Sequence, residues 1–153
     1  MYSKHEISQI RQEFWTVFGQ YMAPVPSAEG EKINWINYKT GVKHLYFKME
    51  ADQTIASVAI TLTHPALDVQ KLYYDHLLQF KKLLHDTTGE EWIWSLHVTE
   101  EGKVLSRIFT ELAGVNIFDK ENWPALISFF KQRLIKLDEF WSQVRYGFDV
   151  LEM

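Results

Sequence analysis

The strongest constraint on how this chain can fold is a long apolar stripe near its C-terminus. Apolar residues recur there at alternating steps of four and three, which predicts one long helix with a continuous apolar face. Leu126, Phe129 and Phe140 widen the stripe beyond a strict two-position seam, so the helix must lie on a sheet or on a partner. The residues of the stripe are Trp123, Ile127, Phe130, Leu134, Leu137, Trp141, Val144 and Phe148.

Two kinds of surface can cover this stripe. The rest of the same chain can do so, or a second copy can pack against it in a symmetric homodimer. In the second case Lys136 and Asp138 would belong to a charged rim around the interface. The dimer hypothesis places these side chains at the contact: Trp123, Phe130, Leu137, Trp141 and Phe148.

Length and composition indicate one ordinary domain, which we expect to span residues 1–153. Apolar residues make up 46% of the chain, enough for a core without covalent staples. The absence of cysteine excludes disulfides, thiolate nucleophiles and cysteine-ligated zinc. No apolar run approaches the roughly 18 residues of a membrane span, and the polar N-terminus lacks a secretory segment. We therefore expect a cytoplasmic protein without a membrane partner, and the net charge of −4 identifies no partner.

The first segment predicts a helix. Ser3 and Glu6 form an S-x-x-E capping box, in which side chains satisfy backbone N–H groups of the first turn. Apolar residues at helical spacing follow as far as Tyr21. Pro24 should end the helix, because proline disfavours helical geometry in the residue before it.

The middle of the chain predicts strands separated by turns and by one helix. His64-Pro65 should open that helix, whose apolar face continues to Leu84. Asp119 should cap the final helix, although Pro124 allows its start to shift toward Asn122. Five stretches alternate or are rich in β-forming residues, namely 33–38, 42–51, 55–63, 91–98 and 104–112.

These elements predict an α+β fold. Its order is helix, three strands, helix, two strands and helix (αβββαββα), with three helices packed on a mainly antiparallel sheet of about five strands. The same order is compatible with the restriction-endonuclease-like core. No repeat, linker or low-complexity tract divides the chain.

No familiar catalytic or cofactor motif is present. The chain has no nucleophile elbow, phosphate-binding loop or paired histidine motif, so we expect no metal and no cofactor. Its six histidines lie on different predicted elements. His76 falls on an apolar stripe and should be a core or boundary residue. A site built from His44, His64 and His97 has no support from their spacing.

A basic segment is the best candidate for a binding surface. Residues 32–48 carry four lysines and no acid. Lysines interleaved with aromatics on a hairpin can neutralise phosphates and stack on bases, which predicts nucleic-acid binding. The alternative is that they line the solvent face of a hairpin and discourage edge pairing. The candidate binding residues are Lys32, Trp35, Tyr38, Lys39, Lys43 and Lys48.

An enzymatic alternative follows from the nuclease-like order of elements. Nucleases of that fold hold magnesium with clustered carboxylates, and a lysine orients the attacking water. Here Glu13, Glu50 and Asp52 are the available carboxylates, but the third predicted strand carries neither acid nor lysine. A divergent metal-dependent hydrolase is therefore the alternative to a non-catalytic binding or assembly module.

Several motifs, taken in their order, resemble an uncharacterised prokaryotic family, the domain of unknown function 4268. The resemblance implies a bacterial cytosolic protein and a link to DNA restriction or defence, since related chains place such a domain after a nuclease-like one. It supplies no catalytic residues. The motifs are Phe14-Trp15, Ile33-Asn34-Trp35 with Tyr38-Lys39-Thr40-Gly41, Trp92-Ile93-Trp94, the stretch from Asp119 to Pro124, and Phe140-Trp141.

Overall fold

The computed structural model describes residues 3–151. It contains four α-helices, four β-strands and two short 3-10 turns within that range. In chain order they are α1 (Lys4–Met22), β1 (Leu45–Ala51), β2 (Ile55–Leu62), α2 (Leu67–Leu78), α3 (Lys81–Thr88), β3 (Ile93–Glu100), β4 (Lys103–Ala113), η1 (Lys120–Asn122), α4 (Trp123–Val144) and η2 (Arg145–Phe148).

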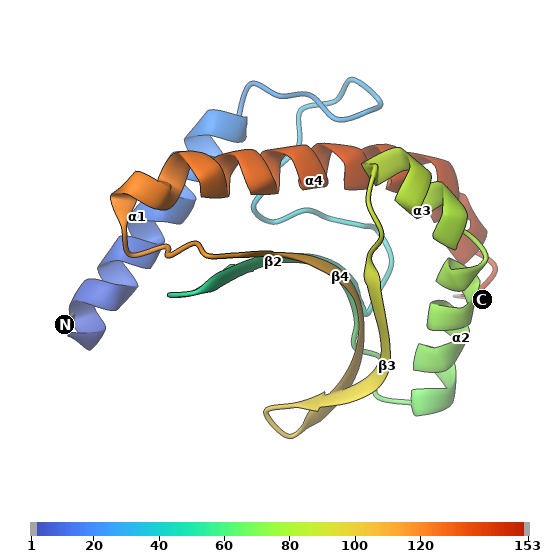
Figure 1. Cartoon of the computed structure of the whole chain (residues 1–153). Helices are drawn as coiled ribbons and strands as arrows, with labels where there is room; N and C mark the ends of the chain where they lie inside the picture. The colour runs from blue at the N-terminus through green and yellow to red at the C-terminus, as the bar shows by residue number, and fades with distance from the viewer. Residues whose placement is uncertain (1–2, 152–153) are drawn as a thin grey trace.

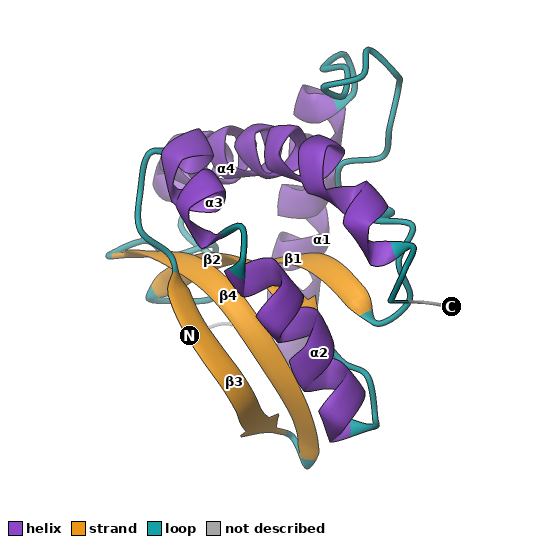
Figure 2. Ribbon diagram, turned by 90° about the vertical axis from the view of Figure 1, so that its right-hand side faces the viewer, coloured by secondary structure: helices purple, strands orange, loops and turns teal. Residues whose placement is uncertain are grey.

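The four strands form one antiparallel sheet in the order β1-β2-β4-β3. The sheet is strongly curved, with α2, α3 and α4 on its convex side, whereas α1 runs past one end of the sheet (Figure 1). Seen from the side, α4 crosses above the sheet while α2 runs beside β4 (Figure 2). The α+β class and the antiparallel sheet predicted from the sequence are confirmed.

Strand register divides the sheet into two chemically different faces. Phe47, Ile60 and Ile108 are neighbours across β1, β2 and β4, and all three are buried beneath the helices. The adjacent pair in the β1–β2 register, Tyr46 and Thr61, faces the opposite, concave side. Small side chains keep the middle of that second face buried although no described helix covers it.

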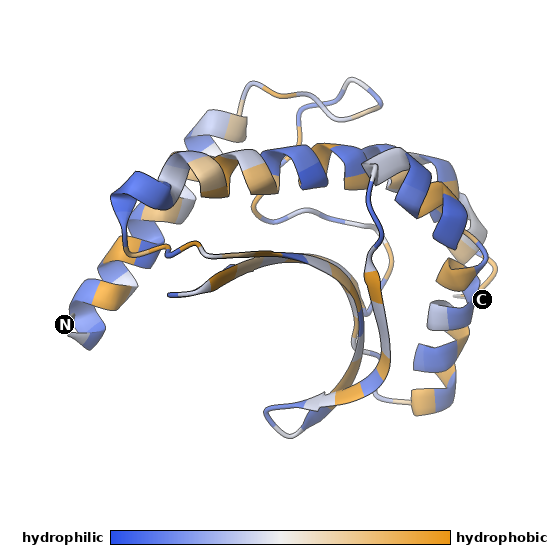
Figure 3. Ribbon diagram, in the orientation of Figure 1, coloured by the Kyte–Doolittle hydropathy of each residue, from blue (hydrophilic) through white to orange (hydrophobic). Residues whose placement is uncertain are grey.

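Helix α4 is the centre of the core. Apolar and polar residues alternate around it (Figure 3), and its apolar side contacts both the sheet and the other helices. The homodimer predicted through this stripe is therefore wrong for these residues, because the chain itself covers them. Each has 8% or less of its surface exposed: Trp123, Phe130, Leu137, Trp141 and Phe148.

The predicted ends of the helices are largely correct. The Ser3 hydroxyl oxygen accepts the Glu6 N–H at 3.2 Å, and α1 ends at Met22. Asp119 caps the short turn η1 rather than α4 itself, since its carboxylate accepts the Glu121 N–H. Helix α4 then starts after Asn122, the later of the two starting points that the sequence allows.

The predicted strand 33–38 is wrong, so the sheet has four strands instead of five. The side chain of Asn34 accepts the N–H groups of Ile36 and Asn37 at 3.1 Å and folds this stretch into a turn. Side-chain hydrogen bonds of this kind compete with strand pairing. The basic segment is consequently a loop that leads into β1, and the predicted hairpin within residues 32–48 does not form.

The predicted second helix is also divided, which gives four helices instead of three. Phe80 leaves helical geometry between α2 and α3 (φ −108°, ψ 16°). The break lets α2 pack on the sheet while α3 packs on α4. A single straight helix could not contact both surfaces.

A buried polar network joins α2 to the sheet. The Gln70 amide donates to the carbonyl oxygens of His64 and Val104, at 3.0 and 3.1 Å. The Ser106 hydroxyl donates to Gln70 Oε1 at 2.6 Å and accepts the His97 N–H at the bulge in β3. Gln70 and Ser106 are fully buried, so this network satisfies groups that water cannot reach.

We expect Gln70→Ala to lower the free energy of unfolding by about 3 kcal/mol, because it leaves buried polar groups without partners. Urea denaturation followed by circular dichroism measures the change. Gln79→Ala, an exposed glutamine at the end of the same helix, is the matched control and should change stability by less than about 0.5 kcal/mol. Equal effects of the two substitutions would contradict the role of the network.

His76 lies at the predicted boundary of the core. Its ring packs edge-on against Phe148 and Phe80, with centroids 4.7 and 5.5 Å apart. A Cβ added to Gly147 would lie 2.8 Å from His76 Nε2, so glycine is required for this contact. Nε2 is buried without a hydrogen-bond partner in the described chain, and burial lowers the pKa of His76.

This lowered pKa makes stability depend on pH with a definite sign. Unfolding exposes His76, which then binds a proton at its ordinary value of about 6.5. Stability that is present above that pH is therefore lost as the pH falls through it. We expect His76→Leu to lose less stability than the wild type between about pH 7.5 and 5.5 in urea denaturation, and an identical loss would refute the assignment.

Candidate functional site

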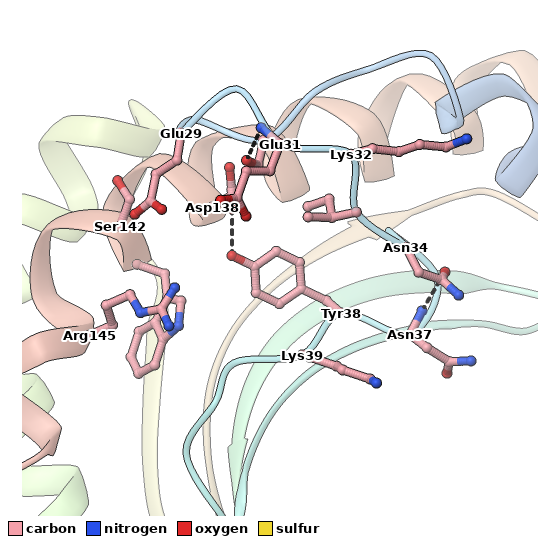
Figure 4. Close-up of a pocket in the computed structure, with 13 residues that line it drawn as sticks. Glu29, Glu31, Lys32, Asn34, Asn37, Tyr38, Lys39, Asp138, Ser142 and Arg145 are labelled. Carbon is pink, nitrogen blue, oxygen red and sulfur yellow. Dashed lines mark hydrogen bonds between the residues drawn. The ribbon is translucent and has the colours of Figure 1, made fainter.

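The main candidate site is a cavity of about 580 Å³ between the loop of residues 27–39 and the C-terminal half of α4. Figure 4 shows Glu29 and Tyr38 of the loop around one space with Asp138, Ser142 and Arg145, whereas Lys32 and Lys39 extend away from that group. Trp141 and Ile33 add apolar surface to a lining that is otherwise mostly polar or charged. Cavities with converging polar groups are the usual location of ligand sites in uncharacterised domains.

Asp138 attaches this loop to α4. Its carboxylate accepts the Ala28 N–H at 2.7 Å and the Tyr38 hydroxyl at 2.5 Å. Only 5% of Asp138 is exposed, and hydrogen bonds to an ionised acceptor are stronger than neutral ones. The two bonds fix both ends of the loop and thereby form one wall of the cavity.

Indole groups hold the loop from the inside. Trp35 donates to the Val25 carbonyl oxygen at 2.9 Å, and Trp141 donates to the Thr40 carbonyl oxygen at the same distance. Both rings are buried. The loop therefore has fixed anchors although it contains no regular secondary structure.

The environment of Tyr38 keeps its hydroxyl protonated. Burial, together with the hydrogen bond to Asp138 and its negative charge, raises the pKa of Tyr38 far above the ordinary value for tyrosine. The positive charge of Arg145 opposes this rise. Tyr38 therefore acts as a hydrogen-bond donor and is not available as a base.

Charged residues of both signs border the cavity. No ion pair joins any acid in this group to any base in it within the described residues 3–151. Arg145 is half-buried, and its guanidinium reaches toward Tyr38 beneath the loop (Figure 4). The acids are Glu29, Glu31 and Asp138, and the bases are Lys32, Lys39 and Arg145.

The structure distributes the predicted basic residues over several surfaces. Lys32 and Lys39 border the cavity, whereas Lys48 lies on β1 and Lys43 is exposed before that strand. Trp35 is 3% exposed, so it is not available to stack on a base. Tyr38 likewise stacks on Phe47 at 4.7 Å and bonds to Asp138.

The three carboxylates of the enzymatic alternative have separate local roles. Glu13 pairs with Lys120 at 2.9 Å. Asp52 accepts the N–H groups of Thr54 and Ile55 in the turn between β1 and β2, and these bonds lower its pKa. Glu50 and Asp52 both line a second hollow, and Glu13 does not line it. Residues 3–151 contain no group of three or more His, Asp or Glu side chains placed to hold a metal ion.

His44 and His64 come together, whereas His97 lies elsewhere. The first two rings contact edge-on with centroids 4.7 Å apart. His97 Nε2 lies 3.1 Å from the Leu67 carbonyl oxygen at the start of α2.

Sequence reasoning missed the importance of Asp138, Arg145 and Glu29. A signal for Asp138 existed, since it lies four residues after Leu134 and three before Trp141. That spacing puts a carboxylate on the buried face of the helix, not on its rim. Arg145 and Glu29 carry no comparable signal, because only the folded loop brings them together.

The family model for DUF4268, a domain of unknown function, matches residues 10–145. The chain belongs to this family. This match confirms the resemblance inferred from the ordered motifs. The matched range includes all the residues that line the cavity. No curated protein and no solved structure matches the chain, so the comparison with the restriction-endonuclease-like core stays a hypothesis. None of the described helices combines the length and apolar character needed to cross a membrane.

We expect Tyr38→Phe to lower the free energy of unfolding by about 2 kcal/mol, because it removes a hydrogen bond to an ionised group. The raised pKa adds a pH test. The unfolded chain ionises near pH 10 while the folded chain keeps its proton, so stability falls as the pH rises through about 10. Urea denaturation at about pH 8 and 10.5 should show a smaller alkaline loss in the variant.

Tyr46→Phe is the matched control for this experiment, since Tyr46 is 47% exposed and its hydroxyl has no hydrogen-bond partner among the described residues. It should leave neutral stability within about 0.5 kcal/mol of the wild type. An alkaline loss that is unchanged in Tyr38→Phe would contradict the assigned role of Tyr38.

Proposed function

We propose that this domain is a non-catalytic binding module and that the cavity between the 27–39 loop and α4 is its ligand site. The unpaired charges around the cavity carry this proposal. Charged side chains of both signs line this one space, and among the described residues none of these acids forms an ion pair with one of these bases. A ligand that supplies both charges would complete interactions that the chain leaves open.

The arrangement favours a small zwitterionic ligand. Arg145 presents a planar set of donors suited to a carboxylate. Asp138 uses its two hydrogen bonds for the loop, but a carboxylate has about four acceptor positions. Together with Glu29 it can accept an ammonium group.

The hydroxyl groups of the cavity support binding in preference to catalysis. An activated hydroxyl nucleophile needs an adjacent base. Ser142 donates to the Glu139 carbonyl oxygen at 2.7 Å, and Tyr38 is held as a neutral phenol. The divergent hydrolase remains the alternative hypothesis, and it would require Glu13, Glu50 and Asp52 to act together.

Amino acids with both charges free should bind, and blocking either charge should weaken binding at least about tenfold, the effect of roughly 1.4 kcal/mol. Titration calorimetry with free amino acids, their N-acetyl derivatives and their amides measures this. Arg145→Gln should weaken zwitterion binding by a similar factor. Lys103→Gln removes one exposed charge from the distant β3–β4 turn and is the matched control.

Two results would overturn the proposal. One is the absence of binding by any zwitterion, and the other is equal binding by Arg145→Gln. Labelled single- and double-stranded DNA, titrated at several salt concentrations, tests the nucleic-acid hypothesis in parallel. A steep loss of affinity with salt, abolished by replacing the four lysines of residues 32–48 with alanine, would favour nucleic acid as the ligand instead.

A further inference from the structure

The outer edge of β1 has a short stretch of unpaired backbone. Thr63 donates to the His44 carbonyl oxygen and Asp52 donates to that of Ile55, both at 2.9 Å, which fixes the hydrogen-bonding phase of the β1–β2 ladder. Residues alternate along an antiparallel strand between bonding one neighbour and facing the other side. The N–H and C=O groups of Phe47 and Met49 therefore point away from β2.

Both ends of this stretch are closed by other parts of the chain. The Thr40 hydroxyl donates to the Leu45 carbonyl oxygen at 2.8 Å, and Arg11 donates to that of Ala51 at 2.8 Å. Between them, Phe47 and Met49 have two donors and two acceptors with no partner in the described chain. The free edge is thus limited to the length of a three-residue contact.

A groove of about 540 Å³ runs along the same edge. Trp15, Ile36 and Tyr38 form its wall on the helical side of the sheet, and Lys48 borders it from the strand. Side chains of an added strand would alternate between these two sides. Two side chains of the added strand would point to the helical side and meet its aromatic and aliphatic surface. The residue between these two would point to the other side and lie opposite Lys48.

We propose that this edge binds an extended peptide of a partner protein as a fifth strand, with an acidic residue opposite Lys48 and an apolar residue on either side of it. Strand addition of this type obtains affinity from backbone hydrogen bonds and specificity from alternate side chains. Lys48 favours an acid directly opposite it, since opposite charges across two strands attract, whereas Glu50, which also borders the groove, disfavours a second acid.

The same argument disfavours a second copy of this chain as the occupant. An antiparallel two-fold pairing that uses only the free groups must place Phe47 opposite Met49 of the other copy. That register puts Lys48 directly opposite its own counterpart. Shifting the register by two residues would recruit the carbonyl oxygen of Leu45 or Ala51, which already accept hydrogen bonds.

Fluorescein-labelled peptides test the proposal directly. The probe is a short alternating peptide with Val-Asp-Val at its centre, measured by fluorescence anisotropy against the full chain. We expect saturable binding that is lost when the backbone nitrogens of both valines are methylated. Replacing the aspartate with lysine should weaken binding at least about tenfold, the effect of roughly 1.4 kcal/mol.

Charge reversal on the protein gives the matched test. Lys48→Glu should bind the aspartate peptide at least tenfold more weakly and should prefer the lysine peptide. Lys82→Glu makes the same change at an exposed position of α3 and should behave as the wild type. Circular dichroism confirms that each variant is folded, and hydrogen exchange should show new protection at the amides of Phe47 and Met49.

Three results of the peptide experiments would overturn the proposal. They are no saturable binding of the aspartate peptide, full binding of the methylated peptide, and equal binding of both peptides by Lys48→Glu. A concentration-dependent dimer that Lys48→Glu abolishes would also overturn it, because the edge would then be filled by a second copy. Arg145→Gln should leave peptide binding unchanged. The proposal for this edge and the proposal for the cavity can therefore fail independently of each other.

Discussion

The burial of α4 is the constraint on which the rest of this fold depends. Its apolar face extends around more than one side, so one covering surface is insufficient. The sheet covers one side, where Phe47 contacts Trp141, and α1 covers another, where Phe14 and Phe18 contact Phe130. Helix α3 adds a third contact. The curvature of the sheet and the break between α2 and α3 both bring more of the chain onto this helix.

Asp138 is the polar exception on this helix, and it explains how a loop without regular structure is held in place. A buried carboxylate is costly unless hydrogen-bonded. The Tyr38 hydroxyl and the Ala28 N–H provide those bonds, and both come from the loop. The requirement to satisfy one charge in the core therefore also shapes the cavity beside it.

Local patterns predicted those parts of the fold that local interactions determine. The Ser3 cap, the end of α1 at Met22 and the alternation of buried and exposed residues in β1 follow from neighbouring residues. The turn at Asn34 was missed because its apolar neighbours also suit a strand. The break at Phe80 could not be foreseen, since no glycine or proline marks it and the helix after it packs on α4, which lies far along the sequence.

The candidate site was less predictable for the same physical reason. Its charged residues are far apart in the sequence, and Lys32, Lys39 and Tyr38 were identified for a different ligand. The dimer hypothesis failed because periodicity shows that a stripe must be covered but not which chain covers it. Because Trp141 and Phe148 are buried, they leave no surface for a partner, whereas the edge of the sheet does.

Tyr38 connects the two surfaces that remain. Its hydroxyl bonds to Asp138 at the cavity, and its ring stacks on Phe47, whose backbone forms part of the free edge. Tyr38 also borders both the cavity and the groove. A change at Tyr38 therefore affects both surfaces and cannot distinguish them. Of these two surfaces, Arg145 borders only the cavity and Lys48 borders only the groove. Substituting each residue separately therefore shows which surface a ligand occupies.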